Sequence, residues 1–220
     1  MDFEWQLFVA SLPSLLKGAV TTVSISVVSL VCGLLLGVAG AIARASHIRP
    51  LVLAVLCWTT LMRGLPLLVT LLFLYYGLPS MGILLDSFTV AVIALSVTTG
   101  AFVTEIVRAG IESIDRGQMR AAKSLGMSWA KGMRHIVLPQ ALRRVLPPLT
   151  SEAITLVKNT ALVSVIAIPD LLRAGTDIMT WKANTFSPFA GVALIYLCMT
   201  LPLVALNTWL EKRTRRGPLT

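Results

Sequence analysis

The sequence predicts an all-α integral membrane protein with five transmembrane helices. Three observations carry this prediction: an excess of apolar residues, long runs without charge, and an uneven distribution of basic residues. Apolar residues make up 56% of the 220 residues, charged residues make up 13%, and the mean hydropathy is +0.83. Soluble domains carry roughly 25% charged residues. A globule of this length cannot bury so much apolar surface, so we expect lipid to cover the rest. The composition argues against a disordered chain, a secreted disulfide scaffold and an ordinary cytosolic enzyme.

Four charge-free runs are long enough to cross a bilayer, which takes ~20 mostly apolar residues in a helix. They are residues 18–43, 64–85, 87–104 and 183–210. A fifth apolar run, about residues 149–168, contains only two charged residues, Glu152 and Lys158. We therefore expect one transmembrane domain over residues 1–220, with a long loop between the third and fourth spans. The expected spans are about 18–43, 51–76, 87–107, 149–168 and 186–210, and the loop is 108–148.

The basic residues indicate which side of the membrane each loop faces. With the N-terminus outside, 14 of the 19 Lys and Arg lie on the inner side, and the outer side keeps Lys17, Arg173 and Lys182. The positive-inside rule favours this orientation, with the C-terminus in the cytoplasm. Topology thus explains the net charge of +9, and we expect no nucleic-acid partner. No basic segment precedes the first span, and it exceeds the ~7–15-residue core of a cleavable signal, so we expect it to be retained.

The second span contains a break signal and a charge. Pro66 cannot donate a hydrogen bond back to Met62, so we expect a kink or a break there. Arg63 is costly against lipid. Two interpretations remain open: a helix that begins late, with Arg63 reaching the interface, or a broken helix that lines a path.

The loop between the third and fourth spans is polar and has its own helix signals. Gly117–Leu125 fits one helix, Gly126 is placed to end it, and Ser128 is placed to cap a second helix. The proline at Leu138–Pro139 predicts the end of that second helix, with a third short helix over 140–146. Such a protrusion is either a docking knob for a cytosolic partner or an amphipathic segment on the bilayer.

Lys158 lies about ten residues into the fourth span, followed by Asn159 and Thr160. An ionisable group at that depth indicates a functional site. The alternative is a structural lysine bound to backbone carbonyls or to a carboxylate such as Glu105.

The sequence contains no constellation typical of an enzyme. It has two histidines, His47 and His135, without ligand spacing, and three widely separated cysteines, Cys32, Cys57 and Cys198. The zinc-protease, nucleophile-elbow, CxxC and phosphate-binding-loop motifs are all absent from it. We therefore expect no catalytic residue, no metal site and no cofactor, and any ATP that powers the protein must be bound by another polypeptide.

The loop motif resembles that of the permease subunits of bacterial ABC importers, most closely the polar amino-acid family (histidine, glutamate, glutamine, arginine, opines). That motif reads E-A-A, three residues, Gly, nine residues, I-x-L-P. Here Ala121, Ala122, Gly126, Ile136 and Leu138–Pro139 keep the spacing without a gap. Further strings that look like the amino-acid branch are 63–68, 105–111, 116–118, 138–141 and 158–164.

The resemblance implies the permease fold of type I ABC importers in the bacterial inner membrane, and a polar amino acid such as glutamate or aspartate as substrate. It also implies three kinds of protein partner: ABC ATPase subunits, a second permease copy or a homologous permease, and a periplasmic amino-acid-binding protein. The coupling loop that would enter the ATPase consists of Arg120, Ala121, Ala122, Gly126, Ile136, Leu138 and Pro139. The candidate residues of the translocation path are Arg63, Glu105, Lys158, Asn159 and Thr160.

The sequence departs from the family pattern at two positions. Arg120 stands where the family motif has glutamate, and Asn159 stands where many relatives have aspartate. Two other classes of function remain open: a secondary transporter or channel subunit with Glu105 and Lys158 as coupling charges, and a membrane scaffold without transport.

Overall fold

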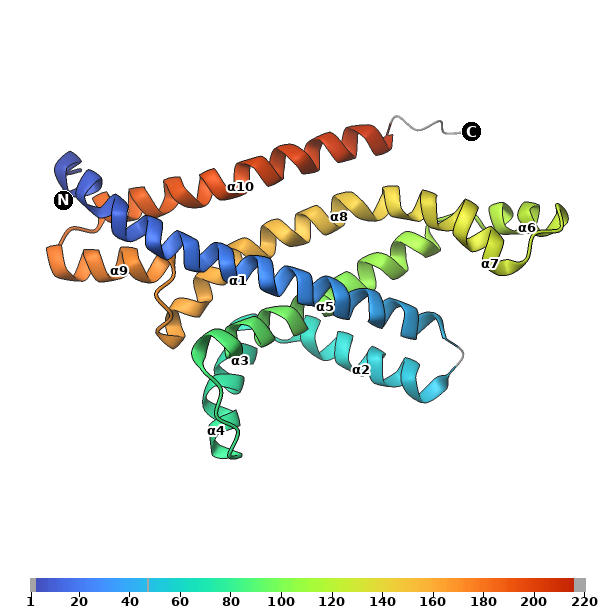
Figure 1. Cartoon of the computed structure of the whole chain (residues 1–220), viewed down its shortest axis with the longest axis horizontal. Helices are drawn as coiled ribbons and strands as arrows, with labels where there is room; N and C mark the ends of the chain where they lie inside the picture. The colour runs from blue at the N-terminus through green and yellow to red at the C-terminus, as the bar shows by residue number, and fades with distance from the viewer. Residues whose placement is uncertain (1–2, 47, 216–220) are drawn as a thin grey trace.

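The structure is a computed structural model that describes residues 3–46 and 48–215. All regular structure in these residues is helical, and the long helices run roughly along one long axis (Figure 1). The helices are α1 (Trp5–Ala45), α2 (Arg49–Gly64), α3 (Leu67–Leu72), α4 (Leu78–Ser80), α5 (Ser87–Glu112), α6 (Arg116–Ser124), α7 (Trp129–Gly132), α8 (Leu138–Asn159), α9 (Leu171–Lys182) and α10 (Phe186–Arg215).

Three shorter stretches join some of these helices. They are π-helical turns at Phe73–Gly77 and Met133–Val137 and a 3₁₀ helix at Thr160–Ile166. Four helical segments are long and apolar enough to cross a membrane, and the bent pair formed by α2 and 67–80 brings the number to five. The expected all-α membrane class is therefore confirmed.

Helices α1 and α5 pack closely because small residues line their contact. Gly33, Gly37 and Gly40 form the buried stripe of α1 that faces α5. A Cβ on Gly37 would overlap the side chain of Val103 and lie 2.9 Å from the carbonyl oxygen of Gly100. This spacing of small residues in the sequence is typical of close helix contacts in membranes.

The end of the molecule near the N-terminus is fixed by polar contacts between α1 and later segments. Asp170 caps α9 by accepting hydrogen bonds from the backbone N–H groups of Arg173 (2.9 Å) and Leu172 (3.3 Å). The backbone N–H of Leu171 donates to the Thr22 hydroxyl at 3.1 Å. Helix α9 therefore lies on α1, in the segment between the fourth and fifth expected spans, for which no helix was predicted from the sequence. Asp170 at its N-cap was a local signal for this helix.

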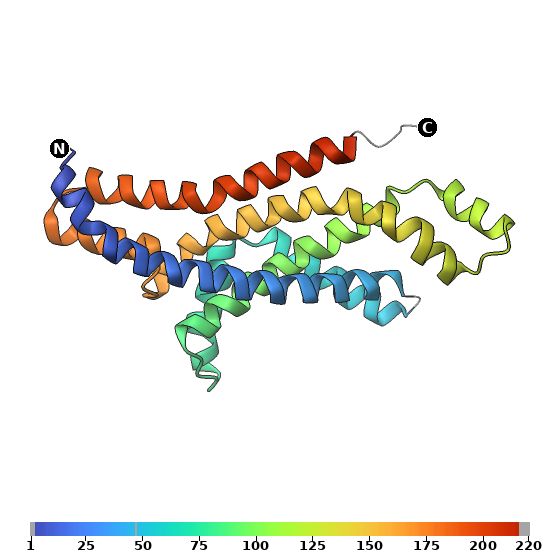
Figure 2. The ribbon, with the colours of Figure 1, turned by 45° about the horizontal axis from the view of Figure 1, so that its top comes forward.

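The second span is broken, as Pro66 predicted. Helix α2 ends at Gly64, α3 begins at Leu67, and the two parts are bent by 108°. The segment after the break leaves the bundle sideways and ends at α4 (Figures 1 and 2). The structure therefore shows a broken helix and not a single helix that begins late.

The expectation of a helix end at Leu138–Pro139 was wrong. Leu138 has helical dihedrals (φ −61°, ψ −43°), and the helical path continues from α7 through the π-helical turn into α8. Pro139 directly follows the π-helical turn, where the regular ladder of i→i−4 hydrogen bonds is already interrupted. Residues 140–146 are accordingly part of α8 and not a separate helix. Packing of Val137 and Ala141 against Ile114 outweighs the local preference of a residue before proline.

Candidate functional site

An open cavity of about 570 Å³ lies where α2, α5 and α8 meet. Three arginines and one glutamate supply its charges: Arg63 from α2, Glu105 and Arg108 from α5, and Arg144 from α8. The other lining residues are Phe102, Ile106, Ala109, Gly110, Ser113 and Pro148. The cavity thus brings together two residues that the sequence singled out, Arg63 and Glu105, which are 42 positions apart.

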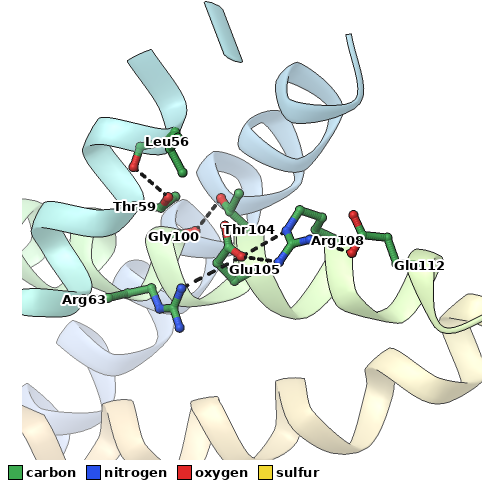
Figure 3. Close-up of polar contacts among 8 residues, drawn as sticks. All are labelled: Leu56, Thr59, Arg63, Gly100, Thr104, Glu105, Arg108 and Glu112. Carbon is green, nitrogen blue, oxygen red and sulfur yellow. Dashed lines mark hydrogen bonds and ion pairs between the residues drawn. The ribbon is translucent and has the colours of Figure 1, made fainter. Parts of the chain in front are cut away.

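Glu105 is the centre of an ionic network (Figure 3). Its Oε2 accepts hydrogen bonds from Nη2 and Nε of Arg108 at 2.8 and 3.0 Å, and Arg63 Nη1 lies 3.9 Å from the same oxygen. Arg108 also pairs with Glu112, one turn further along α5. The Glu105 side chain is only 16% exposed, so it relies on the two guanidinium groups for compensation of its charge.

Local sequence spacing builds most of this network. Glu105, Arg108 and Glu112 follow each other at i, i+3 and i+7 on one face of α5, which places oppositely charged side chains side by side. Arg63 lies in the last turn of α2, just before the break, and its guanidinium carbon is 5.8 Å from the centre of the Phe102 ring. The break at Pro66 therefore decides where α2 ends and how Arg63 meets α5.

Arg144 joins α8 to the end of α5. Its Nη1 donates to the backbone carbonyl of Ser113 at 2.6 Å and to the Ser113 hydroxyl at 3.2 Å. A cation at this position stabilises the carbonyl end of a helix. The sequence analysis did not identify Arg144 or Arg108 as site residues. The i, i+3 spacing of Glu105 and Arg108 was a local signal, whereas Arg144 could not be found from spacing alone.

A polar stripe on α8 continues from the cavity toward Lys158. The exposed residues Arg144, Pro148, Ser151, Thr155 and Lys158 recur every three or four positions, so they share one face of the helix. The stripe extends roughly 21 Å at 1.5 Å per residue. Lys158 is exposed and makes no side-chain hydrogen bond or ion pair with the described residues, since Glu105 is bound by Arg63 and Arg108 instead.

The two residues after Lys158 lie in different surroundings. Asn159 is half-buried at the end of α8. Thr160 is fully buried, and its hydroxyl donates to the carbonyl of Val157 at 2.6 Å. Thr160 therefore faces the interior of this chain and does not reach the polar stripe.

Helices α6 and α7 form a protrusion at the end of the molecule opposite the N-terminus (Figure 1). Gly126 ends the first helix with φ +76°, and the Ser128 hydroxyl accepts from the backbone N–H of Lys131 at 3.4 Å. Both local signals in the sequence are therefore confirmed. The backbone N–H groups of Gly126 and Met127 bond back to α6, which fixes the angle between the two helices.

Some of the loop-motif residues in and next to this protrusion are packed against the chain, and others are exposed. Ala122 is 1% exposed and packs against Gly132. Arg120, Ala121, Leu138 and Pro139 are exposed, and Ile136 is half-buried. Two large apolar side chains, Leu125 and Trp129, are 81% and 60% exposed beside Gly126. They present an apolar tip that motif spacing alone did not reveal as a surface.

Sequence comparisons identify the family of this chain. Residues 33–216 match the family described as "binding-protein-dependent transport system inner membrane component". The chain is 35% identical to the arginine transport system permease protein ArtQ of Bacillus subtilis, over 98% of this chain and 99% of that protein. It is 34% identical to the glutamine transport system permease protein GlnP of Escherichia coli, again over 98% and 99%.

A solved structure extends the likeness to the fold. The crystal structure of an amino acid ABC transporter with histidines contains a chain that is 37% identical and superposes with a TM-score of 0.91, over 97% of this chain and 100% of that one. Such permease subunits are not enzymes themselves. The family match, the identity to permease relatives over nearly the full length and the superposition agree. The chain belongs to the family of binding-protein-dependent inner-membrane transport components, as a multi-pass permease subunit of an amino-acid ABC importer.

Proposed function

We propose that the polar face of α2, α5 and α8 is one wall of a path for a polar amino acid, and that a separate ATPase drives transport. The observation that carries this proposal is the Arg63–Glu105–Arg108 network beside an exposed helix break. Charged side chains and non-helical backbone within a membrane are tolerated only against protein or water. A face that carries both is suited to line a water-filled path.

The charge of the cavity favours an acidic substrate. Three arginines and one glutamate line it, and Lys158 adds a further positive charge along the stripe. Guanidinium groups bind carboxylates in bidentate fashion. Glutamate or aspartate, with a side-chain carboxylate as well as the α-carboxylate, fits this face better than arginine does.

The α6–α7 protrusion is proposed to dock into the ATPase. Its backbone is fixed by the Gly126 turn, its helices pack through Ala122 and Gly132, and its apolar tip is exposed. A rigid element of this kind transmits movement of the ATPase to α5 and α8 as a rotation of whole helices. The periplasmic binding protein would deliver the amino acid at the opposite end.

Reconstituted uptake tests this function. Proteoliposomes that contain the permease, its ATPase and the binding protein should accumulate labelled glutamate only with ATP on the ATPase side. Unlabelled aspartate should compete more strongly than arginine. Equal uptake without the ATPase would mean a secondary transporter, and preferential competition by arginine would exclude the acidic substrate.

We expect Gly126→Val to release the ATPase or to uncouple transport. A β-branched residue is strained at φ +76°, so the turn between α6 and α7 would change its angle. Arg120→Glu should be mild, because Arg120 is exposed and surface ion pairs contribute only ~0–1 kcal/mol. The measurements are retention of the ATPase on the purified complex, and uptake. The opposite ranking of the two variants would mean that charge, not shape, holds the interface.

The inner-side bias of the basic residues supports a periplasmic N-terminus and a cytoplasmic C-terminus. A reporter fused after Thr220 should be active only if it is of the kind that works in the cytoplasm. A periplasmic reporter that is active at this position would contradict the proposed orientation.

A further inference from the structure

An apolar groove of about 320 Å³ lies where α1, α8 and α10 meet, on a different face of α8 from the polar stripe. All three helices belong to segments that are long and apolar enough to cross a membrane. The one hydroxyl in the wall of the groove, on Ser26, already donates to the carbonyl of Thr22 at 2.7 Å. An apolar cavity without a free polar group binds apolar matter in preference to water. The wall includes Val23, Val27 and Leu30 of α1, Ala153 and Val157 of α8, and Pro202 of α10.

One face of α10 leads from this groove to the end of the bundle that carries the α6–α7 protrusion (Figures 1 and 2). Pro202, Leu206, Trp209 and Arg213 follow each other at intervals of four, three and four residues, so they share this face. Leu206 and Trp209 are exposed, and the guanidinium carbon of Arg213 lies 5.1 Å from the centre of the Trp209 ring. A tryptophan beside a basic residue is typical of the membrane–water interface.

A matching face of α8 leads from the groove to the same end. Arg143, Leu146, Thr150 and Ala153 follow each other at intervals of three, four and three residues. The Thr214 hydroxyl of α10 donates to the backbone carbonyl of Arg143 at 3.2 Å. The two helix faces therefore meet where each of them ends in an arginine.

The distance from the arginines to the groove corresponds to one leaflet of a bilayer. Ten positions separate Arg143 from Ala153, and eleven separate Pro202 from Arg213. At 1.5 Å per residue, each helix covers roughly 15–17 Å between its arginine and the groove. One leaflet contributes half of the ~30 Å hydrocarbon core. A lipid with its headgroup at the arginines thus reaches the groove with an acyl chain.

The charge at the headgroup end is positive. Arg143, Lys212 and Arg213 are all exposed. Glu211 is the one acidic residue of α10, and its carboxylate accepts a hydrogen bond from the Asn207 amide at 3.0 Å. Glu211 lies two positions from Arg213, which turns its side chain by roughly 200° to the other side of the helix. The matching headgroup is therefore an anion.

We infer that an anionic phospholipid binds between α8 and α10, with its phosphate at Arg143 and Arg213 and an acyl chain in the groove. Guanidinium groups bind phosphate in bidentate fashion, and basic residues next to membrane helices attract anionic lipids. A second copy of this chain is the poorer occupant, because it would bring the same arginines to this end and be repelled. The site is separate from the proposed path, which uses another face of α8.

Photolabelling of the assembled transporter tests this site. The permease complex with its ATPase is reconstituted into nanodiscs of phosphatidylcholine that contain a small mole fraction of probe. The probe is phosphatidylglycerol with a diazirine near the end of one acyl chain. The test variant combines Arg143→Gln with Arg213→Gln. The matched control combines Arg44→Gln with Arg49→Gln, which removes two cations from the same end of the bundle, at the turn between α1 and α2.

The label should appear in residues 146–157 and 199–206. A basic residue near an anionic lipid contributes roughly fivefold to binding, so the test variant should lower this labelling about 25-fold. The control variant should label as the unsubstituted protein does. Retention of the ATPase shows that both variants assemble.

Four results would overturn the inference. They are equal labelling by phosphatidylcholine with the same chain, an equal loss in the control variant, displacement of the probe by inorganic phosphate, and no label in the groove of the assembled complex. The last result would mean that another protein chain covers the groove. Labelling needs no transport, and the discs carry the probe in both leaflets. The outcome is therefore independent of the proposed substrate and of the proposed orientation.

Discussion

Gly37→Val is expected to lower the free energy of unfolding by about 3 kcal/mol, the upper end of what overpacking of a tight contact costs. The new side chain would overlap Val103, and its Cβ would lie 2.9 Å from the carbonyl oxygen of Gly100. Backbone atoms of α5 cannot turn away as a side chain can, so the two helices must move apart. The hydrogen bond from the Thr104 hydroxyl to the Gly37 carbonyl, 3.1 Å long, would be weakened as well.

The measurement is unfolding of the purified permease in detergent by increasing SDS, followed by helical circular dichroism. Ala39→Val is the matched control, because Ala39 is an exposed position of the same helix, two residues away. It should change stability by no more than about 0.5 kcal/mol. Equal stability of the Gly37 and Ala39 variants would show that α1 and α5 do not approach at the glycine stripe.

Lys158→Leu is expected to reduce amino-acid uptake by about ten- to a hundredfold, while the complex still assembles. A hydrogen bond to a charged group contributes about 1.5–3 kcal/mol, and about 1.4 kcal/mol corresponds to a factor of ten. Lys158 is exposed on the polar stripe and bonds to no described side chain or carbonyl, so its removal breaks no contact within this chain. What it removes is a positive charge along the proposed path.

Uptake by proteoliposomes, with ATPase retention as the assembly check, measures this effect. Lys158→Arg keeps the charge and should retain most of the uptake. Lys182→Leu removes an exposed lysine from the end of α9, away from the stripe, and should transport normally. Normal uptake by Lys158→Leu would remove Lys158 from the path and leave the charges of the cavity, on Arg63, Glu105, Arg108 and Arg144, as the proposed charged part.

Several features of this protein followed from the sequence because short-range rules govern them. The excess of apolar surface that lipid must cover follows from composition. The backbone conformation at Gly126, the cap at Ser128 and the break at Pro66 depend on the residue itself and a few neighbours. Each of these local predictions holds in the structure.

Other features depended on which helix faces meet, and no local pattern determines that. Pro139 continues a helix because Val137 and Ala141 find buried partners. Arg63 meets Glu105 because the break ends α2 beside α5. Spacing alone left Lys158 as a possible partner of Glu105.

The tertiary structure also separated neighbours that the sequence had grouped. Lys158 is exposed on the polar stripe, whereas Thr160 is buried. Two positions along a helix of 3.6 residues per turn rotate a side chain by roughly 200°, to the opposite face, and the packing of this chain decides which face is buried. The sequence determined that a charge occurs within the fourth span, and only the packing of α2, α5 and α8 decided which charges share a face.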